Sequence, residues 1–257
     1  MLLLIDAGNT RIKWALATPQ AGFSAWLSHG ALLHEEGEPL PAAPLPLAQL
    51  RAHWQGQGIT RVLMSNVAGA RVAQLVSDAL GPQAALLEVF KSSAHRAGLA
   101  NAYRDPAQLG SDRFASAIGA RALYPGEALL IATCGTATTI DAISAEGVFT
   151  GGMILPGLRL MAAALHRHTA QLPAVAERMH ARDGFADNTE DAIVLGCLSA
   201  QAGAIERARA RMPQARCIIS GGAGRMVAPF LEGPSTWVDN LVLLGLHAAA
   251  IEKESGC

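Results

Sequence analysis

Charge is scarce and balanced in this sequence of 257 residues. Only 16% of the residues are charged, and 20 Lys and Arg stand against 21 Asp and Glu, which gives a formal net charge of −1. A protein that binds nucleic acid through its phosphates needs a basic surface. The balance therefore argues against a nucleic-acid partner, although a local basic patch would still be compatible with it.

Long apolar runs and patterned cysteines are also lacking. The longest apolar runs are too short to cross a bilayer, and Asp6 interrupts the first of them. The start has no basic segment and no apolar segment of the length that a secretory signal needs, so we expect a cytoplasmic protein with no membrane partner. The four cysteines, Cys134, Cys197, Cys217 and Cys257, show no metal-site spacing and are best interpreted as reduced thiols.

The common nucleotide-binding signatures are missing as well. The sequence contains no G-x-x-x-x-G-K-[ST] and no G-x-G-x-x-G after an expected strand, which weakens the P-loop and Rossmann interpretations. With 51% hydrophobic residues, the chain can bury a core large enough for one big domain or two ordinary ones.

The first informative stretch runs from Leu2 to Lys13. An apolar run, typical of a buried strand, ends in Asp6, Gly8, Asn9 and Thr10. Gly and Asn tolerate positive φ, and a turn of small residues lets backbone N–H groups approach a phosphate, with Asp6 placed to hold Mg²⁺. The alternative is an ordinary hairpin turn with a surface acid.

A second copy of this pattern occurs about 127 residues later. An apolar strand leads into Thr133-Cys134-Gly135-Thr136, and a further strand follows, as in the first copy. A single repeat of this length predicts a duplicated domain. We place the boundary at the turn Tyr124-Pro125-Gly126, with halves of residues 1–124 and 125–257.

The other expected elements follow from periodicity and from helix start and stop signals. A proline-rich connector covers residues 35–47. Ser111 is a fair N-cap for the helix that follows it, with Asp112 in its first turn. Strands are expected at residues 26–33, 61–67, 151–157 and 217–220, and helices at 47–54, 72–80, 158–169, 190–211 and 241–251. Gly221-Gly222-Ala223-Gly224 either approaches an adenosine or is simply a turn.

Seven motifs, in the same order and spacing, resemble those of type III pantothenate kinases. They are Asp6-x-Gly8-Asn9-Thr10, Gly110-x-Asp112-Arg113, Gly135-Thr136-Ala137-x-Thr139, Gly151-Gly152-x-Ile154-x-Pro156-Gly157, Thr169-Ala170-x-Leu172-Pro173, Asn188-Thr189-x-x-Ala192-Ile193-x-x-Gly196 and Ser220-Gly221-Gly222. The resemblance extends from residue 2 to about residue 250. Some members of this family have been described as accessory factors for a virulence regulator.

The resemblance implies an α/β fold with duplicated RNase H-like halves, as in the actin, heat-shock ATPase, acetate kinase and sugar kinase superfamily. It implies ATP-dependent phosphorylation of the primary hydroxyl of pantothenate, the first step toward coenzyme A. The expected cofactors are ATP, Mg²⁺ and a monovalent cation, K⁺ or NH₄⁺, and the expected assembly is a homodimer. One alternative is a nucleotide-binding regulatory protein without turnover, and another is a kinase of a sugar or short carboxylate.

The resemblance also assigns roles to residues of the first half. Asp112 becomes the general base, and its place at a helix start should keep it ionised; the alternative is an acid that only stabilises the helix. Asp6 holds Mg²⁺, and the triphosphate is lined by Gly8, Asn9, Thr10 and Lys13. For Lys13 the alternative is an exposed strand lysine.

Substrate contacts are implied at Tyr103 and at Gly110, Ser111, Asp112 and Arg113. A half-buried structural tyrosine and a surface salt bridge are the alternatives for Tyr103 and Arg113.

In the second half, Thr136 matches a nucleotide-contacting position, and Thr189 matches a substrate threonine supplied across a dimer interface. The alternative for Thr189 is a plain helix N-cap. Many family members carry an aspartate where this chain has Thr133, and that aspartate helps to bind the monovalent cation. Thr133 offers a hydroxyl without a formal charge, which puts the cation dependence in doubt here.

Overall fold

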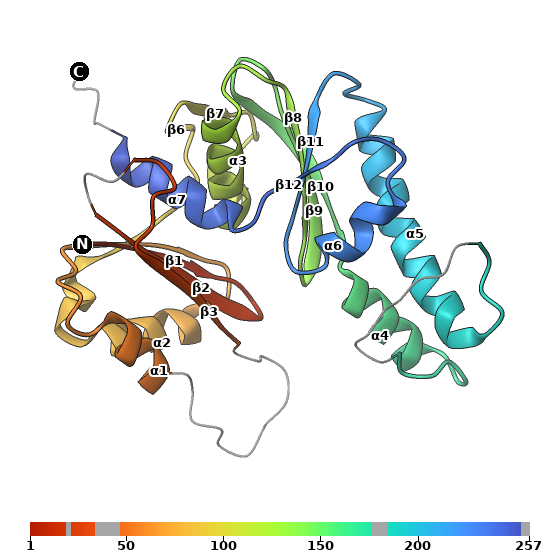
Figure 1. Ribbon diagram of the computed structural model, residues 1–257, viewed down its shortest axis with the longest axis horizontal. Coiled ribbons are helices and arrows are strands. Elements are labelled where there is room, and N and C mark those ends of the chain that lie inside the picture. Colours follow the sequence, from red (N-terminus) through yellow and green to blue (C-terminus); the bar gives the residue numbers. More distant parts are fainter. Residues whose placement is uncertain (19–21, 34–46, 176–183, 253–257) are drawn as a thin grey trace. The chain divides into compact units, whose positions relative to one another are not determined.

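The computed structural model describes residues 1–18, 22–33, 47–175 and 184–252. The chain forms two compact units, one of Met1–Pro125 with Leu241–Cys257 and one of Gly126–Asn240. Each unit combines a sheet with helices (Figure 1). Most of the expected proline-rich connector lies outside the described residues.

The sheet of the first unit is mixed. Strand β1 runs antiparallel to β2 and parallel to β4, and the strand order is β3-β2-β1-β4-β5. The hairpin of β1 and β2 confirms the expected strand-turn-strand at the start of the chain. The strands are β1 Leu2–Ala7, β2 Arg11–Ala17, β3 Ser28–Leu33, β4 Arg61–Asn66 and β5 Leu87–Val89.

Helices cover both faces of this sheet (Figure 1). On one face, Leu3 and Ile5 of β1 share an apolar core with Trp54 of α1 and Val76 of α2. On the other face lie α3 and α7, which pack against each other and against β4. The helices are α1 Leu47–Trp54, α2 Ala70–Leu80, α3 Ser111–Leu123 and α7 Leu241–Ile251; the short hairpin is β6 His95–Arg96 and β7 Leu99–Asn101.

Helix α7 belongs to the first unit, whereas the sequence analysis assigned all of residues 125–257 to the second half. The helix is apolar and most of its residues are buried, so other elements must pack against several of its sides. A Cβ on Gly245 would meet the carbonyl oxygen of Ala115, and one on Gly119 would meet the carbonyl oxygen of Leu241. Two glycines therefore let the backbones of α3 and α7 approach closely, a contact that periodicity does not reveal.

Gly245→Ala should lower the free energy of unfolding by about 2–3 kcal/mol, because the added methyl group overpacks the crossing of α3 and α7. Urea unfolding followed by circular dichroism measures the change. Gly22→Ala is the matched control, since a Cβ there has nothing within 4 Å. Equal stability of the two variants would contradict the close approach.

The second unit repeats the plan of the first. Strand β8 is antiparallel to β9 and parallel to β11, and the order is β10-β9-β8-β11-β12. Counted from the first strand of each unit, five strands of each sheet follow the order 3-2-1-4-5, which confirms the duplicated fold. The strands are β8 Leu129–Cys134, β9 Ala137–Ile143, β10 Val148–Pro156, β11 Arg216–Ser220 and β12 Thr236–Trp237.

The helices of the second unit bury one face of its sheet. Ile193 and Leu198 of α5 share a core with Leu130, Ile140 and Ile219 of the strands. The helices are α4 Leu158–His168, α5 Thr189–Arg209 and the short α6 Gly224–Val227. Among the residues that the structure describes, no helix combines the length and apolar character needed to span a membrane.

Candidate functional site

The hairpin of β1 and β2 positions Asp6 beside Lys13. The two residues are register partners in the antiparallel pair, and the turn between the strands is closed by the Gly8 N–H, which donates to the Arg11 carbonyl oxygen at 3.1 Å. Neither Gly8 nor Asn9 has a positive φ, so the turn does not use the conformational freedom that the sequence analysis expected. Small size at these positions still leaves the turn backbone accessible to a ligand.

Asp6 is not a surface acid. Burial raises the pKa of Asp6 to about 7, Lys13 lowers it in part, and the negative charge of Asp112 raises it. Asp6 is the register partner of Ser65 on β4, and the Ser65 hydroxyl bonds to that of Ser111, the residue before Asp112, so the chain brings both acids to the same region of the first unit. The stretch does form a hairpin turn, with Asp6 half-buried near the end of β1, and the role of Asp6 toward a metal stays a prediction.

Helix α3 presents Asp112 from its first turn. The N-cap is Gly110, and no side chain makes a capping hydrogen bond, so the expectation that Ser111 caps the helix is wrong. The Ser111 hydroxyl instead bonds to the Ser65 hydroxyl at 2.8 Å. A Cβ at position 110 would lie 2.8 Å from Asp112 Oδ1, so Gly110 leaves room for the carboxylate.

The pKa of Asp112 is raised, whereas the sequence analysis expected the helix start to keep the group ionised. Burial is the largest influence. The charge of Arg113 and backbone N–H groups oppose it, and the Arg113 N–H donates to Asp112 Oδ1 at 2.8 Å. Loss of solvation therefore outweighs the favourable field of the helix terminus, which makes Asp112 a better proton acceptor than a solvated aspartate.

Arg113 and Tyr103 form one polar unit. The Arg113 side chain donates from Nη1 to the Tyr103 hydroxyl at 3.0 Å, and its guanidinium lies 5.8 Å from the ring centroid. Arg113 is only 7% exposed, so the alternative of a surface salt bridge is wrong. Tyr103 is half-buried, as in its structural interpretation, but its contact with Arg113 also joins the two predicted substrate residues.

Two residues near these groups escaped the sequence analysis. Asn101 is buried and accepts from the Tyr103 N–H at 3.1 Å, and it donates to the Pro106 carbonyl oxygen at 3.2 Å, so it shapes the loop that carries Tyr103. Ser65, the partner of Ser111, is fully buried. Asparagine before a turn was a usable signal, whereas a lone serine in an apolar strand carries none.

The donor set around Asp6 suits a divalent cation. A buried carboxyl group with a raised pKa and a second carboxyl group nearby favour a positive charge between them. Carboxylate oxygens are the ligands that Mg²⁺ prefers, usually together with waters and substrate phosphates. Within the described residues no cluster of three or more His, Cys, Asp or Glu forms a complete metal cage. The arrangement is therefore suited to a metal that arrives with a phosphate ligand.

In the second unit the predicted loop is shorter than expected. Strand β8 extends through Cys134, so Thr133 lies within the strand, paired with Thr139 of β9. The turn consists of Gly135 and Thr136, and both are exposed. Thr136 is thus available to a ligand, while Thr133 is half-buried in the ladder.

Two glycines pack against this turn within the second unit. A Cβ on Gly157 would meet the carbonyl oxygens of Gly135 and Thr136. Gly221 has a φ of 86°, and its Cβ would meet the Cys134 backbone. The loop from Gly221 to Gly224 therefore supports the turn, and its predicted approach to an adenosine stays a prediction.

Thr189 begins α5 but does not cap it. The cap is Asn188, whose side-chain oxygen accepts from the Asp191 N–H at 2.9 Å. The helix-cap alternative for Thr189 is therefore wrong. Its side chain is exposed at the start of the helix, and its substrate role stays a prediction.

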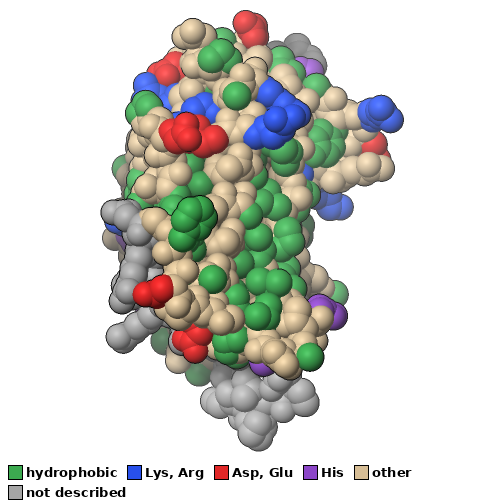
Figure 2. Space-filling view, turned by 90° about the vertical axis from the view of Figure 1, so that its right-hand side faces the viewer, with side chains coloured by type: hydrophobic (Ala, Val, Ile, Leu, Met, Phe, Trp, Pro, Cys, Tyr) green, Lys and Arg blue, Asp and Glu red, His purple; other side chains and the backbone are tan. Residues whose placement is uncertain are grey.

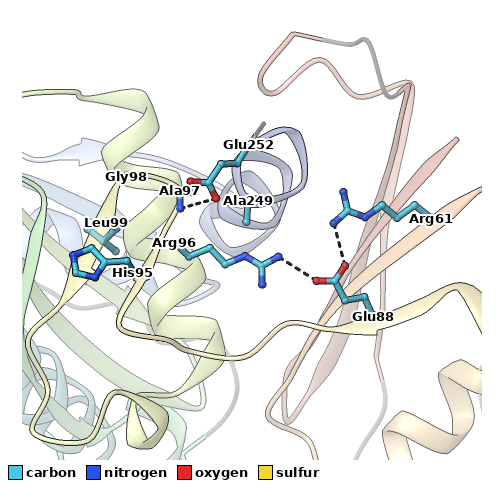
Figure 3. A pocket seen from close by; sticks show the side chains of 9 residues that line it. All are labelled: Arg61, Glu88, His95, Arg96, Ala97, Gly98, Leu99, Ala249 and Glu252. Atoms are coloured by element: carbon cyan, nitrogen blue, oxygen red, sulfur yellow. Dashed lines mark hydrogen bonds and ion pairs between the residues drawn. The ribbon is translucent and has the colours of Figure 1, made fainter. Parts of the chain in front are cut away.

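The first unit also contains a pocket of about 660 Å³ (Figure 3). Arg61 and Arg96 both pair with Glu88, at 3.0 and 3.1 Å, and Arg61 donates to the Ala250 carbonyl oxygen at 2.9 Å. None of the residues that line it is a predicted site residue. They are Arg61, Glu88, His95, Arg96, Ala97, Gly98, Leu99, Ala249 and Glu252.

Solved structures of other proteins have the same fold. A Campylobacter jejuni protein assigned to the Baf family of transcriptional activators matches 95% of this chain and 94% of its own, with a TM-score of 0.58 and 18% identity. A Sinorhizobium meliloti protein assigned as a 2-dehydro-3-deoxygalactonokinase matches 97% and 98%, with a TM-score of 0.56 and 16% identity. The chain thus has the duplicated actin-like fold that sugar kinases share with ATPases.

Sequence relatives then define the family. A family model described as type III pantothenate kinase matches residues 2–211. A type III pantothenate kinase of Janthinobacterium sp. (strain Marseille) is 50% identical, and one of Herminiimonas arsenicoxydans is 51% identical, each over 100% of both chains. The chain belongs to the type III pantothenate kinase family.

Proposed function

We propose that this chain transfers the terminal phosphoryl group of ATP to the primary hydroxyl of pantothenate, the first step of coenzyme A biosynthesis. Family membership over nearly the whole length supports the reaction. The observation that carries the proposal in the structure is the placement of Asp6 and Asp112, one near the end of a strand and one in the first turn of a helix that the Ser65–Ser111 hydrogen bond ties to the neighbouring strand.

In this proposal Asp112 is the general base. Its carboxylate orients the acceptor hydroxyl and takes its proton as the bond to phosphorus forms. In a loose phosphoryl-transfer transition state the proton leaves late, so orientation is much of the work. The raised pKa of Asp112 supports the role, because a stronger base accepts the proton more readily.

Asp6 would hold Mg²⁺, which neutralises charge on the phosphates when it is bound. The triphosphate would lie along the first turn, where Gly8, Asn9 and Thr10 offer backbone and side-chain donors and Lys13 offers a positive charge. Lys13 already interacts with Asp6, which supports a place beside the phosphates. In the second unit, Thr136 on its exposed turn is the proposed further contact to the nucleotide.

For pantothenate, Arg113 and Tyr103 supply a joined cation and hydroxyl, suited to a ligand with a carboxylate and polar groups. Gly110 and Ser111 precede the base and complete the proposed acceptor contacts. Thr189 is the proposed contribution from a second copy of the chain.

A coupled ADP-release assay with pantothenate, glycerol and acetate as competing acceptors tests the function. We expect turnover with pantothenate alone. Turnover with glycerol or acetate in its place would indicate a different kinase of the same fold. Nucleotide binding without turnover on any acceptor would indicate the regulatory alternative.

We place the enzyme in the cytoplasm as a homodimer. Cys134, Cys197 and Cys217 are free and buried, as suits a reducing compartment. For the dimer, Figure 2 shows hydrophobic side chains gathered on the face that it presents, the side of Figure 1 with α4 and α5. Exposed apolar side chains in this unit include Ile154 and Leu160, and such a surface favours association with a second copy. Sedimentation velocity measures the state.

The monovalent cation is proposed to bind near Thr133, through hydroxyl and carbonyl oxygens. Thr133→Asp would add a formal charge at this strand position, so we expect a stronger dependence of turnover on K⁺. Rates measured in K⁺, NH₄⁺ and Na⁺ salts at equal ionic strength provide the check. An unchanged salt response would count against this location for the ion.

A further inference from the structure

Ser65 is a buried hydroxyl at the end of β4, beside the strand that carries Asp6. In the parallel pair of β1 and β4, Ser65 is the register partner of Asp6. Paired residues of neighbouring strands direct their side chains to the same face of the sheet. Ser65 has 0% of its surface exposed, and a polar group so placed needs a hydrogen-bond partner.

That partner is Ser111, the first residue of α3. The two hydroxyl oxygens are 2.8 Å apart, an ordinary distance for O–H···O, and either one can donate. Ser111 directly precedes Asp112. The bond therefore ties the helix turn that carries Asp112 to the strand next to β1, which carries Asp6.

Stability alone does not account for this pair. When two buried hydroxyls bond only to each other, replacing both with apolar groups changes the free energy of unfolding little. The hydrogen bond is lost, but no buried polar group is left without a partner. What the bond does supply is a fixed position. It prevents the start of α3 from sliding along the sheet.

We infer that Ser65 is a positioning residue for phosphoryl transfer, acting through Ser111 to hold Asp112 beside Asp6. The inference rests on the proposed function for its catalytic consequence. Ser65 itself has no contact with substrate in this account. Its role is to keep the base in line with the acceptor hydroxyl, where misplacement by about 1 Å is enough to cost about 100-fold in rate.

Ser65→Ala should lower kcat by about tenfold or more and leave the KM values for ATP and pantothenate within about twofold. Ser65→Thr, which restores the hydroxyl, should recover most of the lost kcat. Ser116→Ala is the matched control, a serine of the same helix that is only 3% exposed, and it should retain the wild-type rate. Thermal unfolding of each variant verifies that it is folded.

A double-mutant cycle tests whether Ser65 acts through its partner. If the link is the cause, Ser65→Ala combined with Ser111→Ala should be no slower than the slower single variant. Independent losses, in which the fold-changes in kcat multiply, would overturn the inference.

A readout without turnover separates this inference from the proposed function. The first turn of α3 has a hydrogen bond of its own, in which the Phe114 N–H donates to the Gly110 carbonyl oxygen at 3.0 Å. If Ser65→Ala frees the start of the helix, amide hydrogen exchange at Phe114 in ligand-free protein should become at least about tenfold faster, while Ser116→Ala leaves it unchanged. This change is expected even if the wild type fails to phosphorylate pantothenate, a result that would overturn only the function.

The exchange measurement also gives the decisive negative result. An unchanged exchange rate at Phe114 in folded Ser65→Ala would mean that the start of α3 has kept its place, and it would overturn the inference whether or not turnover falls.

Discussion

Asp112→Asn should retain ATP affinity within about threefold and lose phosphoryl transfer by about 10²–10⁴-fold, the usual contribution of a positioned general base. The amide has nearly the shape of the carboxyl group but does not take a proton from the acceptor hydroxyl. Equilibrium binding of ATP by calorimetry, together with the rate of ADP release in saturating pantothenate, measures the two properties separately.

The control for this substitution is Asp78→Asn. Asp78 is an exposed aspartate of α2 in the same unit, bonded to Gln74, and its loss should leave turnover unchanged. Near-normal turnover of Asp112→Asn would remove Asp112 from the role of base. Loss of ATP binding together with turnover would assign it to the nucleotide site instead.

Asp6→Asn should abolish measurable turnover at ordinary Mg²⁺ concentrations and yet stabilise the ligand-free protein at about pH 8. The first effect follows from the loss of the carboxylate proposed to hold the metal. In the wild type, proton and metal compete for the same group, so Mg²⁺-dependent turnover should fall about tenfold per pH unit below about pH 7. Rates measured against Mg²⁺ concentration at several pH values provide the test.

The second effect follows from the same pKa. Asp6 has a pKa of about 7 in the folded protein and 3.8 as an unperturbed aspartate. Between these values the folded state binds more protons than the unfolded state, so the free energy of unfolding decreases as the pH rises, by at most about 1.4 kcal/mol per pH unit. The stabilisation by the bound proton is fully present below about pH 4 and absent above about pH 7.

Asp6→Asn removes this dependence, because the amide does not ionise. Urea unfolding without Mg²⁺ or nucleotide, from about pH 5 to about pH 8, should show a smaller slope in Asp6→Asn than in the wild type and in Asp78→Asn. Asp112 has a raised pKa too and contributes a slope of the same sign, so the difference between wild type and variant isolates Asp6. Parallel stability curves would show that Asp6 is solvated.

The sequence was sufficient for those parts of the fold that local patterns determine. The apolar run before Asp6 and its second copy before Thr133 predicted two hairpins, and the structure has both, each followed by the same order of strands within its unit. The packing of elements that are far apart in the chain could not be predicted from the sequence. The place of α7 depends on Gly119 and Gly245, whose role appears only where the backbones of two distant helices meet.

The candidate site shows the same division. Motifs identified Asp6 and Asp112. The direction of the pKa shift of Asp112 could not be predicted from its place at a helix start, because burial outweighs the effect of the helix terminus. Ser111 has a residue type suited to a cap, and its hydroxyl is instead engaged by Ser65, which is 46 residues away in the chain. The sequence does not show whether a side chain forms its hydrogen bond within its own helix or with a residue far away in the chain.

The return of α7 to the first unit makes the second unit an insertion within the first. During synthesis, residues 126–240 emerge from the ribosome in one piece, whereas the first unit stays incomplete until its last helix is released. A premature stop after about residue 240 would therefore damage the half that is translated first and leave the later half with all of its residues.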